Sequence, residues 1–338
     1  MKRALAKAIK DISPEQRAMY AERLIRGVTD EKNDPTQQYN AVALDYVRKI
    51  QALFDGTVIR RDGKSKDYKG DRINDLEDYN DRIAFVRLYP AELDALDNAA
   101  SRIRAGAIST GIIADGSKFF MDIRKGLGHI SAIGLGRTGP VFTTMEAFKR
   151  NKSSKIERSA QMIRHILRRD DAPEIEFTTE GEVTFPPLPQ IPEGQPEPGR
   201  TNQVLVYCEF AALIPCVVSV YRLFGIKCLW IDGNIPVNTR QERIDRFRAG
   251  KDERVMIMSA VGMTGLNLSC ANFVIFFDQP WSSQDEEQFI GRAWRPPQKK
   301  QVWVYHLIAL GTTDVLMCGM ARGKSAMLDE FLQRKNAP

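Results

Sequence analysis

One glutamine, one glycine and two arginines near residue 290 follow the spacing Q-x-x-G-R-x-x-R, formed by Gln288, Gly291, Arg292 and Arg295. On a helix, Gln288, Arg292 and Arg295 fall at positions i, i+4 and i+7 and share one face. Pro296 disfavours continuing the helix, so Arg295 is expected at its end, where a cation is favourable. Two fixed guanidinium groups suit a triphosphate whose negative charge grows during hydrolysis. Two arginines alone more often form a solvated helix end, so the surrounding sequence must decide.

Composition sets the broad class of protein. The chain has 338 residues and 43% hydrophobic residues, enough for a packed core in one large domain or two small ones. A net charge of +6 and an isoelectric point of about 9.0 are compatible with nucleic-acid binding, although soluble enzymes often share them. Five cysteines without a C-x-x-C pair predict buried thiols, a reducing compartment and no zinc site. Three scattered histidines predict no metal cluster, and the absence of long apolar runs predicts no membrane span or signal peptide.

After Arg200, apolar runs of strand length alternate with helix-like segments. The expected strands are residues 203–208, 226–231, 255–259, 273–278 and 302–308. An amphipathic helix is expected over residues 238–249. Runs that are apolar almost throughout predict an α/β fold, with a parallel sheet covered by helices on both faces.

The sequence before Arg200 is less regular. Helix is expected over most of residues 1–50, over 90–104 and, with many basic residues, over 149–169, and a short strand over 83–88. Residues 170–200 contain seven prolines and many acidic residues, which predicts an exposed linker or insertion.

Three glycine-containing strings imitate nucleotide-binding motifs. Gly134, Gly136 and Gly139 satisfy G-x-G-x-x-G, but no clear strand precedes them, which disfavours a dinucleotide site. The strings at residues 111–118 and 319–325 both lack the order or spacing of a phosphate-binding loop. No D-E-x-x box ends an apolar strand either, so the parts that usually hold phosphates and magnesium are missing.

Polar groups follow successive predicted strands. The strand that begins at Val255 runs into a turn with Gly262 and Gly265, where backbone can approach a ligand closely. Asp278 ends the next strand, at the edge where open α/β sheets bind ligands. The arginine-bearing segment follows directly, and packing alone hardly explains this order.

Several segments match a known family in order. Residues 203–210 resemble helicase motif IV, and residues 265–268 read G-L-N-L as in motif V. The pattern D-G-x…R-x-x-x-I-x-x-F is matched by Asp232, Gly233, Arg240, Ile244 and Phe247. Motif VI and its lead-in are matched by Asp278, Trp281, Gln288, Arg292, Arg295 and Gln298. Weaker upstream matches are residues 59–61, 124–129 and 152–156. Over roughly residues 150–315 the chain resembles the C-terminal helicase lobe of the Swi/Snf-type chromatin-remodelling ATPases, in helicase superfamily two.

The sequence departs from the family at three motifs. The paired glycines of motif V are replaced by Gly262 and Met263, and the usual W-N-P by Trp281, Ser282 and Ser283. The usual H-R-I-G-Q reads W-R-P-P-Q over residues 294–298. Both arginines are kept, whereas the family's first lobe is absent from the sequence.

The resemblance implies a single RecA-like lobe with a parallel sheet flanked by helices, over residues 149–318, with residues 170–200 as the insertion. A mainly helical segment, residues 1–148, would correspond to the region between the lobes, and residues 319–338 would form a helical tail. The resemblance assigns Arg292 and Arg295 as arginine fingers. They would act on ATP and Mg²⁺ that are held by a complementary first lobe, in cis or in trans. Gln288, Gly265 and Asn267 would face the nucleotide. Double-stranded DNA would be contacted by Asp232, Gly233, Met258 and Ser259.

The resemblance further implies a DNA translocase in the nucleus that cannot hydrolyse ATP as this chain alone. Three origins remain open: a fragment of a longer ATPase, a subunit that pairs with a separate first lobe, and a non-catalytic DNA- or protein-binding relic. A scaffold module that uses the basic helix over residues 149–169 is a competing interpretation. It would not respond to Arg295→Ala.

Overall fold

The computed structural model describes residues 66–71, 76–110, 116–134, 136–260, 265–315, 317 and 318. The chain divides into two compact units. One unit consists of Leu76–Pro280 and Glu287–Asp314 and contains the sheet. Of the other unit, the described residues are 66–71, 281–286, 315, 317 and 318. Within it, the Asp67 carboxylate accepts hydrogen bonds from the N–H groups of Lys69 and Asp71, at 2.8 and 3.0 Å.

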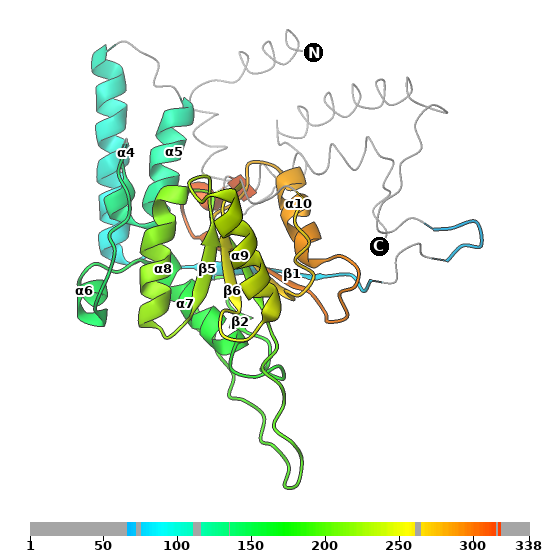
Figure 1. Cartoon of the computed structure of the whole chain (residues 1–338). Helices are drawn as coiled ribbons and strands as arrows, with labels where there is room; N and C mark the ends of the chain where they lie inside the picture. The colour runs from blue at the N-terminus through cyan, green and yellow to red at the C-terminus, as the bar shows by residue number, and fades with distance from the viewer. Residues whose placement is uncertain are drawn as a thin grey trace, which may run out of the picture. The chain divides into compact units, whose positions relative to one another are not determined.

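A six-stranded sheet forms the centre of the larger unit, and each strand pair in it is parallel. The strand order is β1-β8-β7-β4-β6-β5. The strands are β1 (Asn80–Val86), β4 (Val204–Tyr207), β5 (Cys228–Ile231), β6 (Val255–Met258), β7 (Phe273–Phe276) and β8 (Trp303–Ala309). The five strands predicted after Arg200 and the parallel α/β fold are therefore confirmed (Figure 1).

Helices cover both faces of the sheet because alternate strand residues point to opposite sides. On one face, strand residues such as Val206 and Ile257 share a core with α7 (Ser154–Ile166) and α8 (Ile214–Leu223). On the other, residues such as Leu205 and Met256 share a core with α9 (Val237–Ala249) and α10 (Ser283–Ala293). These two layers explain why the strands are apolar along their whole length.

The sixth strand, β1, comes from the part of the chain that was predicted to be mainly helical. It pairs with β8 over seven residues, from Asn80 opposite Trp303 to Val86 opposite Ala309. The compact unit thus begins at Leu76, and the predicted boundary at residue 148 lies inside it. Two helices that follow, α4 (Pro90–Thr110) and α5 (Gly116–Gly128), lie side by side and share a small core with Leu88 and Ala309 (Figure 1).

The basic helix predicted over residues 149–169 is two helices, α6 (Met145–Arg150) and α7. Ser153 separates them and caps α7, since its hydroxyl accepts a hydrogen bond from the N–H of Ile156 at 3.3 Å. The Ser153 hydroxyl also donates to the carbonyl of Gly128 at 2.7 Å. Short 3₁₀ helices precede α6 and α8, at Ile130–Ala132 and Ala211–Leu213.

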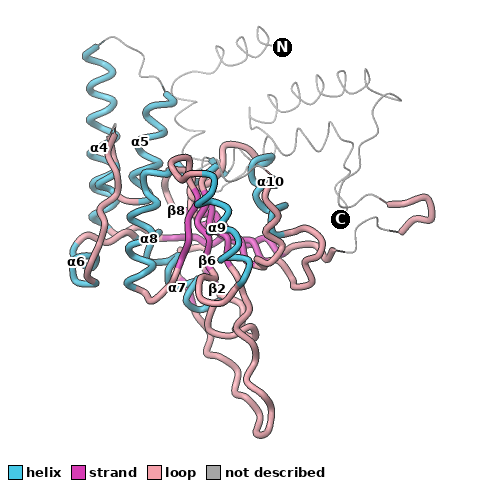
Figure 2. The backbone as a smooth tube through the Cα atoms, in the orientation of Figure 1, coloured by secondary structure: helices cyan, strands magenta, loops and turns pink. Residues whose placement is uncertain are grey.

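The predicted acidic insertion contains a small antiparallel pair, β2 (Glu176–Phe177) and β3 (Val183–Thr184). Figure 2 shows the rest of it as a loop that extends away from the sheet. Predictions for residues 1–65 and 319–338, and for Gly262 and Met263, lie outside the described residues.

Candidate nucleotide and nucleic-acid interface

The carboxyl ends of the parallel strands meet at one edge of the sheet, as the sequence predicted for the polar residues. Asp278 follows β7, and its carboxylate accepts a hydrogen bond from the N–H of Glu209, which follows β4, at 3.1 Å. Ser259 follows β6, and its N–H donates to the carbonyl of Ile231 at the end of β5, at 3.1 Å. In open α/β sheets this edge is where ligands bind.

Arg292 near the end of α10 is held against the turn that follows β6. Its carbonyl accepts a hydrogen bond from the N–H of Leu268 at 3.0 Å, and its Nη1 donates to the carbonyl of Leu266 at 3.4 Å. Its Nε is buried and has no hydrogen-bond partner among the described residues. Burial, and next the nearby charge of Arg295, lowers the pKa of the Arg292 guanidinium. An anion beside the two guanidinium groups would offset the repulsion between these cations.

Arg295 lies beyond the helix, which corrects the prediction that one helical face carries all three polar residues. α10 ends at Ala293, and the N–H of Arg295 bonds to the Ala293 carbonyl at 3.0 Å in a tighter turn. The indole of Trp294, the first residue after the helix, packs edge-on against Tyr79 with ring centres 5.3 Å apart. The side chains of Gln288 and Arg295 are both exposed, whereas that of Arg292 is half-buried.

Gly265 and Asn267 lie in the same turn as the backbone contacts of Arg292. Gly265 has a φ of +78°, which L side chains rarely adopt, and an added Cβ would meet nothing within 4 Å in the described structure. Asn267 is half-buried, and its side-chain oxygen accepts a hydrogen bond from the N–H of Ser269 at 3.1 Å. That oxygen therefore stabilises the turn, and the amide NH₂ group of Asn267 is the part of the side chain that could contact a ligand.

Of the four residues predicted to contact DNA, Asp232 and Gly233 lie in the loop after β5. The Asp232 carboxylate accepts a hydrogen bond from the N–H of Asn234 at 2.8 Å, and the Gly233 carbonyl accepts one from Arg240 at 3.3 Å. Asp232 is only 6% exposed, whereas Gly233 is exposed. The aspartate is suited to shaping the loop and the glycine to meeting a ligand.

The side chain of Met258 does not reach the surface, so it is not available for the predicted DNA contact. Its side chain is 0% exposed and packs in the core under α9 and α10. It occupies the last position of β6, where all four strand residues are buried. Ser259, the next residue, is buried at 4% exposure, and its hydroxyl has no hydrogen-bond partner among the described residues.

Sequence reasoning missed a buried ionic cluster at the same edge. Lys155 at the start of α7 is 0% exposed, and its Nζ lies 2.8 Å from Asp314 Oδ2 and 4.0 Å from Asp278 Oδ1. The ammonium group also lies 5.2 Å from the centre of the Phe277 ring. The three charged residues are far apart in sequence, so no motif spacing reveals the cluster.

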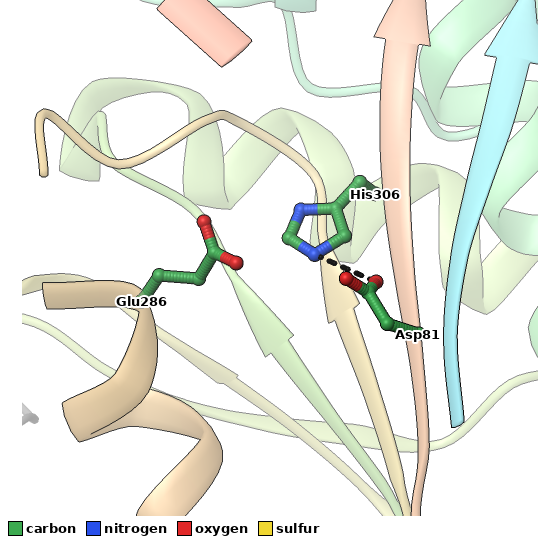
Figure 3. A group of neighbouring side chains, drawn as sticks. All are labelled: Asp81, Glu286 and His306. Carbon is green, nitrogen blue, oxygen red and sulfur yellow. Dashed lines mark ion pairs between the residues drawn. The ribbon is translucent and has the colours of Figure 1, made fainter. Parts of the chain in front are cut away.

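A second polar group lies on the neighbouring strands β8 and β1. His306 donates or accepts at both ring nitrogens: Nδ1 is 3.2 Å from Gln279 Oε1, and Nε2 is 3.2 Å from Asp81 Oδ1. Figure 3 shows the ion pair between His306 and Asp81. The imidazole stacks on Phe276 with ring centres 4.7 Å apart. This pair joins β1 to β8 and fixes the edge of the sheet.

Burial of Asp278 predicts a specific pH dependence of stability. Burial raises the pKa of Asp278 to about 6, against the opposing attraction of Lys155. The folded protein therefore retains a proton that the unfolded chain loses from about pH 4, and this contribution to stability disappears as the pH rises through about 6. We expect Asp278→Asn to become more stable relative to wild type between about pH 4 and about pH 7, by up to about 3 kcal/mol. Urea unfolding at several pH values measures the difference.

The matched control is Asp97→Asn, which changes an exposed carboxylate on α4. Its stability relative to wild type should stay constant over the same range. A constant difference for Asp278→Asn would show that Asp278 is not protonated in this range.

The geometry defines the class of protein. A parallel sheet with helices on both faces, polar loops at the carboxyl ends of its strands and an arginine at the end of the last covering helix together form a RecA-like lobe. Residues 190–297 match the family of the helicase conserved C-terminal domain. The chain therefore contains a helicase C-terminal domain, of the type found in Swi2/Snf2 chromatin-remodelling ATPases, and the resemblance inferred from the motifs is confirmed.

Similar proteins support this placement. A stretch of 136 residues is 32% identical to the chromatin-remodeling ATPase INO80 of Cryptococcus neoformans, covering 40% of this chain and 8% of that protein. The C-terminal part of the Fun30 ATPase domain is similar in structure, with a TM-score of 0.52 and 18% identity over 78% of this chain and 100% of that one. The Sulfolobus solfataricus SWI2/SNF2 ATPase core, solved with double-stranded DNA, also has a TM-score of 0.52 and 18% identity, over 86% of this chain and 52% of that one. Both structural likenesses concern the fold.

Within the described residues, no helix combines the length and the apolarity that crossing a membrane requires.

Proposed function

We propose that this chain provides the second RecA-like lobe of a Snf2-type, ATP-dependent DNA translocase, with Arg292 and Arg295 as its arginine fingers. The observation that carries the proposal is the buried Nε of Arg292, which has no hydrogen-bond partner among the described residues and lies beside the loop between β6 and β7. Arg292 is held by the backbone of the turn at Leu266 and Leu268, so the guanidinium is positioned before a phosphate arrives. Arg295 is exposed and free to approach the same anion from outside the lobe.

Gln288, Gly265 and Asn267 would line the nucleotide beside the arginines. Gly265 lets the backbone come close to a ribose or phosphate, because no side chain projects there. Gln288 is exposed and lies one helical turn before Arg292 on α10. The phosphates and Mg²⁺ would be held by a first lobe, in cis or in trans, since the sequence has no phosphate-binding loop.

Double-stranded DNA would bind across the loops that follow β5 and β6. Gly233 is exposed there, and the buried hydroxyl of Ser259 at the end of β6 has no hydrogen-bond partner in the described part of the chain. The DNA-bound Sulfolobus relative of similar fold and the name of the INO80 relative support DNA as the partner and the nucleus as the location. Binding through the phosphate backbone would be salt-dependent and largely independent of sequence.

Isolated residues 1–338 should not hydrolyse ATP. Half of the donors that grip a triphosphate would come from the first lobe, so we expect no DNA-stimulated turnover by the purified chain. Activity should appear when the first lobe of a Snf2-type ATPase is added or fused. A coupled phosphate-release assay with and without duplex DNA measures both.

Two results would contradict this proposal. Turnover by the chain alone that Arg292→Ala abolishes would show a complete active site without a partner lobe. No turnover with any Snf2-type first lobe, despite salt-sensitive DNA binding, would favour a non-catalytic DNA-binding protein instead.

A further inference from the structure

The acidic insertion carries a proline at every third position over one stretch, at Pro186, Pro189 and Pro192. A polyproline II helix has three residues per turn, so these prolines would form one continuous ridge. The structure assigns neither helix nor strand to residues 185–192. Only the carbonyls of Pro189 and Pro192 accept hydrogen bonds there, among the contacts of the described chain. A backbone without internal hydrogen bonds is what polyproline II requires.

The same period places two more apolar side chains together. Leu188 and Ile191 are three residues apart and would form a second ridge beside the prolines. The third ridge would carry Pro187, Gln190 and Glu193, all exposed, of which the last two are polar. Ile191 is 38% exposed although it is apolar. The stretch is therefore amphipathic, with two apolar ridges and a third that is polar after Pro187.

The acidic insertion, residues 170–200, forms an arm whose base is anchored to the folded unit. Arg169 donates to the carbonyl of Pro189 at 2.8 Å and pairs with Asp171 at 2.6 Å. Asp170 accepts hydrogen bonds from the N–H groups of Thr201 and Asn202, at 2.7 and 2.9 Å. These contacts close the arm at both ends and limit the conformational entropy that a partner would have to remove.

The tip of the arm is exposed and ends in a defined turn. Residues 189–197 are all exposed. The N–H of Gln195 bonds to the Pro192 carbonyl at 3.1 Å, and Gly194 has a φ of +83°, as a type II turn requires at its third residue. Figure 2 shows this loop extending away from the helices and strands. The arm is thus presented to a partner.

Charge indicates which kind of partner fits. Residues 170–200 contain eight acidic residues and a single basic one, Arg200. DNA would be repelled by this charge. A protein groove rimmed by lysines and arginines would be attracted.

We propose that residues 186–192 are a docking ligand for a protein domain that binds polyproline II segments in an aromatic-lined groove with a basic rim. Such grooves recognise proline ridges because the ligand is already extended and loses little entropy on binding. The acidic residues around the ridge match the basic rim and set the orientation of the bound segment. This docking does not depend on the nucleotide site and would bring a second protein to the lobe.

The test uses the full chain and a panel of purified SH3, WW and EVH1 domains, chosen with basic and with acidic groove rims. Binding by titration calorimetry is expected for domains with basic rims, with affinity that falls as salt rises. The variant Pro189→Ala/Pro192→Ala should weaken binding at least about tenfold. The matched control, Pro196→Ala/Pro198→Ala, removes two prolines that lie beyond the turn at residues 192–195 and outside the proposed ligand, and it should bind as wild type.

Three outcomes would overturn the proposal. One is the absence of binding to every domain of the panel. Another is binding that the Pro189→Ala/Pro192→Ala variant does not weaken. A third is self-association of the chain that this variant abolishes, which would show that a second copy occupies the arm. Circular dichroism of each variant confirms that the sheet and helices are intact.

Discussion

Arg292→Ala should reduce the maximal ATPase rate of the two-lobed complex by about 10³-fold or more, with a smaller effect on the Michaelis constant. The guanidinium would stabilise charge that develops on the transferred phosphoryl group, which is largest in the transition state. Its Nη1 donates to the carbonyl of Leu266, which orients the guanidinium group before reaction. Steady-state kinetics with saturating duplex DNA, in the complex of this chain with a Snf2-type first lobe, measures the loss.

Two further variants separate charge from geometry. Arg292→Lys keeps the charge but loses the planar, forked donor, so it should remain strongly impaired. Arg222→Ala removes an exposed arginine on α8 and should retain full activity. Activity within about threefold of wild type for Arg292→Ala would remove Arg292 from the proposed site.

Lys155→Met should destabilise the fold by about 3–5 kcal/mol at neutral pH. The ammonium group is 0% exposed and lies 2.8 Å from Asp314, so its removal leaves a carboxylate buried without its counter-charge. Methionine fills most of the same volume, which limits the loss from packing. Equilibrium unfolding in urea, followed by circular dichroism, measures the change in the free energy of unfolding.

The double variant Lys155→Met/Asp314→Asn distinguishes the loss of charge balance from the loss of packing. The asparagine oxygen can still accept the hydrogen bond that Asp314 receives from the N–H of Ala309 at 3.2 Å. We expect the double variant to recover part of the lost stability, because no carboxylate at position 314 then requires a cation. A Lys155→Met variant within about 1 kcal/mol of wild type would mean that the cluster contributes little to the fold.

The central strands were predicted correctly from the sequence. A strand buried on both faces is apolar along its whole length, and such a short apolar run has few other interpretations. The same pattern does not reveal that the side chain of Met258, a predicted DNA contact, lies in the core. The last residue of a strand such as β6 can be as buried as its centre, although the next residue, Ser259, reaches the ligand edge. Motif position alone does not separate these two neighbours.

Other features depend on tertiary contacts that no local pattern contains. β1 has a mixed burial pattern and becomes part of the sheet through its pairing with β8, more than 200 residues later. The helix with Arg292 was expected to reach Arg295, but packing of Trp294 on Tyr79 accompanies an earlier end at Ala293. The Lys155 cluster likewise joins residues from three distant segments.

The partnership of β1 with β8 also sets the order in which the molecule can be completed during synthesis. Residues 80–86 leave the ribosome long before residues 303–309. β1 must therefore remain without its partner strand β8 while the residues between them are made. Such non-local pairing slows folding and leaves an unpaired edge open to aggregation in the meantime. Emergence of residues 303–309 would then be the event that closes the sheet, and a nascent chain stalled before it should depend on chaperones.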